Sequence, residues 1–202
     1  HVLYDLGFCM YMLGDIEEAK KMLHESIDIA NLTNNMVLKA YTLTSLGLYA
    51  YDEGDHIKSR QYFEDGLLLA KEIGDNWTIV EATAGLGVLA CMDEEDYTKS
   101  KQLLNTALSL ATKSGYIPEQ LFVLVWFAKV LAKQNQFERA IEIASMCMNH
   151  LGTNSEVKHY AEKIISDLQL SLPSDLVKST LDRGASLDLD TTVNQTLQET
   201  QR

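Results

Sequence analysis

Histidine and cysteine are the residue types in this 202-residue chain best suited to proton transfer, nucleophilic attack or metal binding. They occur at His1, His24, His56, His150, His159, Cys9, Cys91 and Cys147. Cys147 and His150 are three residues apart, which places them on one helical face, and His159 follows soon after. A structural zinc site needs four converging ligands, and the sequence offers no fourth near these three. The spacing therefore favours a small buried thiol over a metal centre.

Other catalytic signatures are missing from the sequence. It contains neither a Gly-rich phosphate loop ending in Gly-Lys-Ser/Thr nor a Gly-x-Ser-x-Gly nucleophile turn. His56 stands where Tyr97 and Phe137 stand at equivalent positions further along, so we predict that it packs or caps a helix. The acidic run at 93–96 lacks the alternating spacing and the glycine of a calcium loop, and Asp96 is predicted to be a helix cap. The sequence predicts no enzyme activity, no bound metal and no cofactor.

The charge balance argues against direct contact with nucleic acid. Acidic residues outnumber basic ones 29 to 17, the formal net charge is −12, and the basic residues form no cluster that could replace phosphate counterions. Hydrophobic residues make up 46 % of the chain, which is enough for a folded core, and only two prolines interrupt it, which favours long helices.

The cysteine count and the hydropathy pattern predict a cytoplasmic protein. Three widely spaced cysteines do not form a disulfide framework, and no apolar run reaches the roughly 18 residues of a membrane span. The chain begins at His1, inside a segment with helical apolar periodicity, so we expect it to be a piece of a longer protein.

A motif of about ten residues is repeated along the chain. It reads LGFCMYMLGD at Leu6–Asp15, LGLYAYDEGD at Leu46–Asp55 and LGVLACMDEED at Leu86–Asp96. A fourth copy replaces Leu-Gly with Phe127-Ala128. Small residues also recur in register, at Ala19, Ser59, Ser100 and Ala140 and again at Ser26, Gly66, Ala107 and Cys147. Such a repeat indicates stacked units that bury each other's apolar faces.

Each repeat predicts two helices joined by a short turn. The predicted helices are 2–13, 16–32, 36–52, 56–72, 77–93, 97–113, 118–133, 137–150, 155–170, 174–183 and 190–200. Asp15, Asp55 and Asp96 are placed to cap the second helices, and Gly74 to end one of them. Ser155 is predicted to cap the ninth helix, and Gly184 to separate the last two segments.

These features resemble tetratricopeptide repeats from Val2 to about Leu151: Leu-Gly on the first helix, a small residue early on the second, and a large residue four later. The period of 40 is longer than the usual 34, and the Trp and the closing Pro of the standard pattern are absent. The sequence is most similar to the long-repeat subclass in the C-terminal regions of MalT-like and AfsR-like bacterial regulators. The segment AEKIISDLQLSLPSDLVKSTLDRGASLDLD is similar to the ends of such proteins.

The resemblance implies an all-α fold, a right-handed superhelix (α-solenoid) of four helix-turn-helix repeats with C-terminal capping helices. The repeats are expected within 1–151, at about 1–34, 35–75, 76–115 and 116–151. A capping helix is expected within 152–172. The helical tail at 173–202 is left with three alternatives: capping the solenoid, filling its groove, or forming a homodimer.

In such a superhelix the first helices line a concave groove. The residues predicted to line it are apolar and aromatic, with two lysines at one end: Tyr4, Phe8, Tyr11, Tyr41, Thr44, Leu48, Tyr51, Val88, Met92, Phe122, Lys129 and Lys133. Apolar aromatic stripes of this kind mark binding surfaces for helices or extended peptides.

The predicted function is therefore a non-catalytic protein-interaction or scaffold module, the C-terminal region of a larger bacterial signal-transduction or transcriptional regulator. Its partner would be a protein, a peptide or another domain of the same chain. The alternative is a sensor domain that binds a small molecule or signalling peptide in the groove. An open aromatic channel would favour the interaction module, and a closed pocket with a few converging polar groups would favour the sensor.

Overall fold

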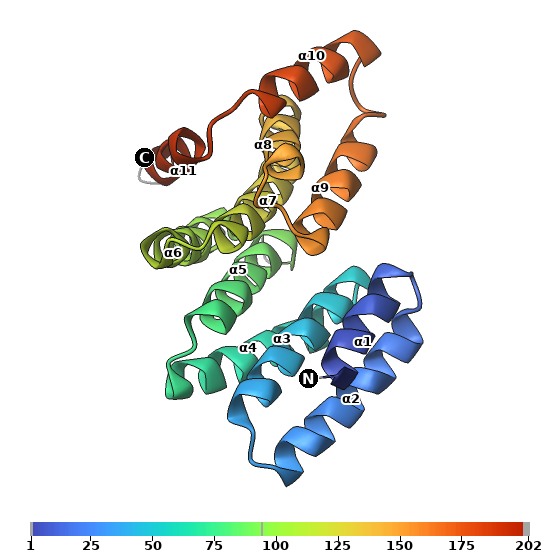
Figure 1. Ribbon diagram of the computed structural model, residues 1–202. Helices are drawn as coiled ribbons and strands as arrows, with labels where there is room; N and C mark the ends of the chain where they lie inside the picture. The colour runs from blue at the N-terminus through green and yellow to red at the C-terminus, as the bar shows by residue number, and fades with distance from the viewer. Residues whose placement is uncertain (1, 94, 200–202) are drawn as a thin grey trace.

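The computed structural model describes residues 2–93 and 95–199, and this part of the chain is all-α (Figure 1). Its helices are α1 (Val2–Met12), α2 (Ile16–Leu32), α3 (Met36–Asp52), α4 (His56–Ile73), α5 (Asn76–Asp93), α6 (Tyr97–Ser114), α7 (Ile117–Lys133), α8 (Phe137–Asn149), α9 (Ser155–Leu168), α10 (Ser174–Ala185) and α11 (Leu189–Glu199). None of these helices is both long and apolar enough to cross a membrane.

The first eight helices pack as four consecutive hairpins, α1 with α2, α3 with α4, α5 with α6, and α7 with α8. Each second helix also packs on the first helix of the next hairpin, and α3, α5 and α7 are neighbours in turn (Figure 1). The predicted helices are confirmed to within a few residues at their ends.

Glycine in the repeated Leu-Gly pair lets the two helices of a hairpin approach closely. A Cβ atom on Gly47 would lie 2.8 Å from Cδ1 of Phe63, and one on Gly87 would lie 3.0 Å from Cγ of Leu104. The large residue of the second helix thus packs directly on the glycine of the first. The small residues that recur in register, Ala19, Ser59, Ser100 and Ala140, are all 0 % exposed. The repeated sequence motif therefore reflects the packing of the two helices in each hairpin.

The turns confirm most of the predicted caps. The carboxylates of Asp15, Asp55 and Asp96 each accept a hydrogen bond from the backbone N–H three residues on, at 3.2, 3.1 and 2.9 Å. Gly74 ends α4 in the left-handed conformation at φ 72°. The prediction for α9 is wrong by one residue: the Oδ1 atom of Asn154, not Ser155, accepts the cap hydrogen bond, at 2.8 Å from Val157 N.

The C-terminal helices lie on the end of this stack. Helix α9 packs on α7 and α8, α10 packs on α8, and α11 lies beside α6 (Figure 1). The described part of the tail thus packs on helices α6 and α8 of the same chain. Gly184 is predicted to separate the last two helical segments, but it lies in the last turn of α10 and is buried against α8. A Cβ there would lie 2.7 Å from Ser145 Cβ and 2.9 Å from Glu142 Cα.

Substitution Gly184→Ala is expected to undock α10. The added methyl group would meet the backbone of α8, which cannot move aside as a side chain can, so we expect a loss of about 1–3 kcal/mol in the free energy of unfolding. Hydrogen exchange should rise in α10 and α11, with little change in α3 and α4. The matched control is Ala185→Gly, an exposed neighbour in the last turn of the same helix. Unchanged exchange in α10 with Gly184→Ala would contradict this account of the packing.

Candidate functional site

The residues predicted to line a groove are mostly buried. Five of them are nearly inaccessible: Tyr11, Thr44, Leu48, Val88 and Phe122, at 0–5 % exposed. Six are half-buried: Tyr4, Phe8, Tyr41, Tyr51, Met92 and Lys129. Only Lys133 is exposed. Most of these side chains are therefore packed within the molecule and not open to solvent. We call the side of α1, α3 and α7 that carries Tyr11, Tyr51 and Phe122 the inner face.

Thr44 has a different role from the one predicted. A Cβ atom on Gly66 would lie only 2.8 Å from Oγ1 of Thr44, so the Thr44 side chain faces α4 and not the inner face. Its hydroxyl donates to the carbonyl oxygen of Ala40 at 3.1 Å. A partner that bound the inner face would not contact this side chain.

The inner face is filled by aromatic rings from four helices. Tyr11 of α1 stacks on Tyr49 of α3 with ring centroids 4.1 Å apart. On the other side, Trp126 of α7 contacts Tyr51 edge-on at 5.2 Å and Tyr160 of α9 at 5.0 Å. Such contacts add to the stabilisation from burial alone. The rings therefore join the first two repeats to the C-terminal cap.

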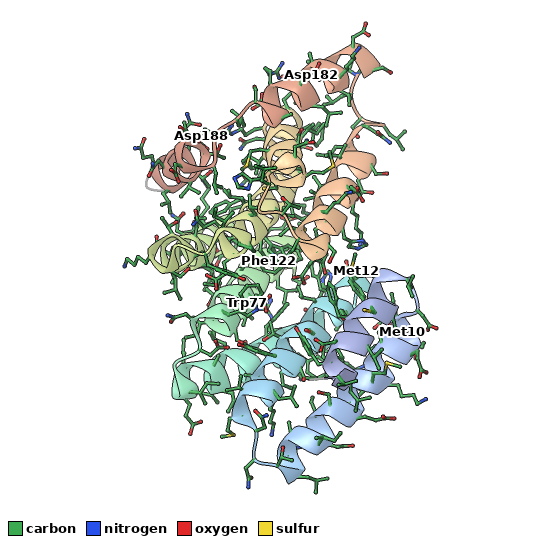
Figure 2. The ribbon with its side chains drawn as sticks, viewed as in Figure 1. Met10, Met12, Trp77, Phe122, Asp182 and Asp188 are labelled. Atoms are coloured by element: carbon green, nitrogen blue, oxygen red, sulfur yellow. The ribbon has the colours of Figure 1, made fainter. Side chains whose placement is uncertain are left out.

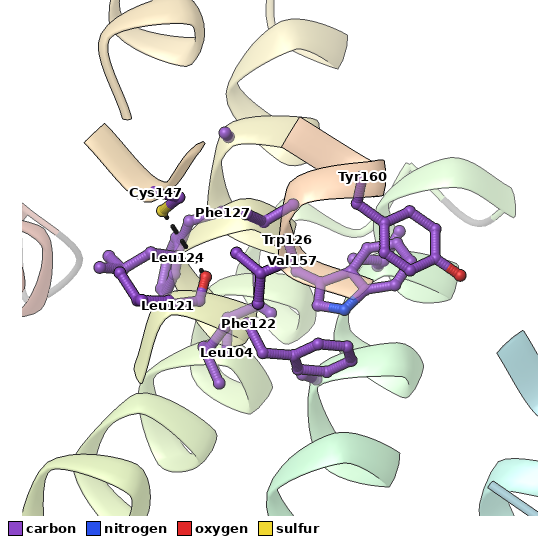
Figure 3. Packing of buried hydrophobic residues seen from close by; sticks show 14 of the residues in the cluster. Leu104, Leu121, Phe122, Leu124, Trp126, Phe127, Cys147, Val157 and Tyr160 are labelled. Atoms are coloured by element: carbon purple, nitrogen blue, oxygen red, sulfur yellow. Dashed lines mark hydrogen bonds between the residues drawn. The ribbon is translucent and has the colours of Figure 1, made fainter. Parts of the chain in front are cut away.

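Trp126 and Phe122 form the centre of this packing. Figure 3 shows Trp126 with Tyr160 on one side and Phe122 close by, and Figure 2 places Phe122 in the middle of the molecule. The Phe122 and Trp126 rings are 5.8 Å apart and nearly perpendicular. The Nε1 atom of Trp126 is buried without a hydrogen-bond partner among the described residues.

One carboxylate ties α9 to the N-terminal repeats. Asp52, at the end of α3, accepts hydrogen bonds from the hydroxyls of Tyr11 and Tyr160, the latter at 3.0 Å, and from Lys163 Nζ at 2.8 Å. We call these four residues the Asp52 cluster. The Asp52 side chain is 6 % exposed, and the Lys163 side chain is 42 % exposed. Burial, followed by the Asp52 charge, raises the pKa of both tyrosines, so their hydroxyls stay protonated and donate.

Sequence reasoning identified Tyr11 but missed Asp52, Tyr160 and Lys163. The Asp52–Lys163 pair spans 111 residues along the chain. The apolar periodicity of 155–168 indicated an amphipathic helix, but nothing in that pattern specified which distant helix its polar edge would meet.

Three carboxyl groups lie on the inner side of the stack. Glu81 of α5 and Glu119 of α7 are 7 % and 6 % exposed, and Glu156 of α9 is half-buried. Burial raises the pKa of all three; for Glu81 the next cause is the charge of Glu156, and the pKa of Glu156 itself rises to about 7. Because burial disfavours the charged form of Glu156, ionisation of this group opposes the docking of α9.

His56, His150 and Cys147 each make a different structural contact. His56 stacks on Tyr51 with ring centroids 5.4 Å apart and hydrogen-bonds to Asp93. His150 Nδ1 accepts the backbone N–H of Gly152 at 2.9 Å. The buried Cys147 thiol donates to the Leu121 carbonyl oxygen at 3.6 Å (Figure 3), and burial raises its pKa. Within residues 2–93 and 95–199, no three His, Cys, Asp or Glu side chains converge as a metal ion would require.

A comparison of the chain with models of known protein families finds no match, and no curated protein is significantly similar to it.

Proposed function

We propose that this chain is a non-catalytic interaction module, a right-handed tetratricopeptide-type solenoid whose inner face binds an amphipathic helix. The observation that carries the proposal is that α9, which packs on α7 and α8, also presents Tyr160 and Lys163 to Asp52 at the end of α3. The buried side of α9 repeats at helical spacing: Val157, Tyr160, Ala161, Ile164 and Leu168. Helix-in-groove recognition uses anchors at this spacing.

The chemistry of the contact suits a helix that can be exchanged. Aromatic anchors such as Trp126 and Tyr160 supply most of the affinity in surfaces of this kind. The Asp52 cluster fixes the register of the helix, because Tyr160 and Lys163, three residues apart on α9, reach the same carboxylate. Burial raises the pKa of both Glu81 and Glu156, so the intramolecular contact weakens when these carboxyl groups ionise.

In this proposal a partner helix with the same pattern displaces α9, or α9 is itself the regulated element. The partner is a protein, a peptide or another domain of a larger bacterial cytoplasmic regulator. The alternative function, a sensor for a small molecule, is supported by a cleft between α7 and α9.

A peptide displacement experiment tests the proposal. The protein carrying Tyr160→Ala and Lys163→Ala has a weakened α9 but an intact acceptor surface at Tyr11 and Asp52. A fluorescent peptide with the native sequence of residues 154–170 should bind this variant at least about tenfold more tightly than the wild-type chain, by fluorescence anisotropy, because each lost charged hydrogen bond is worth about 1.5–3 kcal/mol.

Two controls make the outcome specific. A peptide that carries the same two alanines should not bind, and a protein variant changed on the exposed side of α9, Lys158→Ala with Glu162→Ala, should behave as wild type. Where the double variant loses its helical circular dichroism, Lys163→Ala alone replaces it. Failure of the native peptide to bind a folded variant would overturn the proposed function.

A further inference from the structure

A cleft of about 190 Å³ lies between the C-terminal half of α7 and the outer half of α9. Its floor and one wall are apolar, made by Met92, Ala132, Ile164 and Leu168. Its charged groups are Lys129, Lys133 and Asp167. A second, much smaller cavity of about 10 Å³ shares Lys129 and Ile164 with it and reaches Trp126. Lys129 and Ile164 thus lie between the cleft and the aromatic packing around Trp126.

The charge at this site is opposite to that of the protein. Lys129 and Lys133 stand one helical turn apart on α7, and Lys163 approaches from α9, in a chain whose formal net charge is −12. Lys163 is occupied by Asp52. Lys133 makes no ion pair within the described part of the chain. Positive charge is thus concentrated where the rest of the molecule is acidic.

Lys129 is the more buried of the two α7 lysines at the site, and its charge is only weakly compensated. It is half-buried, and its Nζ atom approaches the carboxylate of the exposed Asp167 only to 3.9 Å, the outer limit of an ion pair. Burial lowers the pKa of Lys129; Asp167 opposes this change, and the nearby Lys163 ammonium adds to it. A half-buried ammonium without a close anion is costly, and an incoming carboxylate would relieve that cost.

We propose that the cleft binds a monocarboxylate with a short apolar tail. The carboxylate takes the charge of Lys129, with Lys133 at the open side, and the apolar tail covers Met92, Ile164 and Leu168. The volume fits this ligand class, because a cavity of about 150 Å³ holds one benzene ring. The ligand contacts α7 and α9 together, so its binding also holds α9 in place. The cleft uses Met92 and Lys129 of the predicted groove and Ile164 and Leu168 from the buried side of α9, so it exists only while α9 is docked. It does not depend on a protein partner.

Octanoate and its neutral analogue octanamide provide the test. Trp77→Phe leaves Trp126 as the only tryptophan, beside Lys129 at the site, so the fluorescence of this variant reports binding. We expect octanoate to bind at least about tenfold more tightly than octanamide, since a hydrogen bond to a charged group contributes about 1.5–3 kcal/mol. Equal affinity for the two probes, or no binding of octanoate up to about 1 mM, would overturn the proposal.

Lys129→Met supplies the second arm of the test. This substitution keeps the length of the side chain and removes a half-buried charge, so the fold should be as stable as wild type or more so. Octanoate affinity should fall at least about tenfold. The matched control is Lys113→Met, an exposed lysine at the end of α6, which should leave affinity unchanged. Retention of octanoate binding by Lys129→Met would assign the binding to another surface.

Discussion

Phe63→Ala is expected to lower the free energy of unfolding by about 3–5 kcal/mol, the largest effect among the substitutions considered. Phe63 is 1 % exposed and lies between two glycines, Gly47 in its own hairpin and Gly85 in the next. Its ring is therefore the contact that joins the second repeat to the third. Loss of the ring leaves a cavity lined partly by glycine, which has no side chain with which to fill it. Urea denaturation at pH 7 measures the effect.

The control is Leu68→Ala, a large apolar residue on the same helix that is 70 % exposed, which should change stability by less than about 0.5 kcal/mol. A double-mutant cycle with Gly85→Ala sharpens the test. A Cβ on Gly85 would overlap the Phe63 ring, so Gly85→Ala should be destabilising alone but nearly neutral in the Phe63→Ala protein. Additive effects of the two changes would show that Phe63 does not fill the space between these glycines.

The contacts within each repeat could be predicted from sequence because they depend on local spacing. The Leu-Gly pair, the small residue of the second helix and the Asp caps lie within about 20 residues of one another, and each has a simple steric or hydrogen-bonding cause. The turn between the two helices of each hairpin also has a residue with positive φ at an equivalent position, namely Gly14, Gly54, Glu95 and Asn135.

The way in which the inner face closes could not be predicted in this manner. The sequence indicated an aromatic face on the first helices, and the structure places aromatic side chains there. However, whether that face is open depends on where α9 lies, and this is decided by Tyr160 and Lys163 meeting Asp52 more than 100 residues away. Gly184 is a second example of a long-range contact that the sequence did not predict. A glycine at this position suggested the end of a helix, whereas in the structure it allows close contact with Glu142 and Ser145 of α8.

Glu156→Gln is expected to stabilise the protein by about 2–3 kcal/mol at pH 8 and to have little effect at pH 5. The pKa of Glu156 rises from its usual value near 4.5 to about 7 in the folded state, through burial and then the charge of Asp52. The folded protein therefore holds a proton that the unfolded chain loses near pH 4.5. Its contribution to stability is complete below that pH and is lost as the pH rises through about 7.

Glu81 makes this dependence steeper. Its pKa lies well above the usual value because of burial, and the charges that raise it further are those of Glu156, Glu119 and Asp75. The charge of an ionised Glu156 makes the ionisation of Glu81 more costly, so Glu156→Gln should also lower the pKa of Glu81. The wild-type chain should lose stability between pH 5 and pH 8, and Glu156→Gln should lose less.

Urea denaturation at several pH values measures this difference, with Glu162→Gln as the matched control on the exposed side of α9. Hydrogen exchange adds the location: in wild type, amides of α9 should exchange faster at pH 8 than the intrinsic pH dependence of exchange accounts for, and Glu156→Gln should remove the excess. A parallel pH profile for Glu156→Gln and wild type would mean that Glu156 is fully hydrated. In that case α9 would be held by the aromatic contacts and the Asp52 cluster without opposition from the buried carboxyl groups.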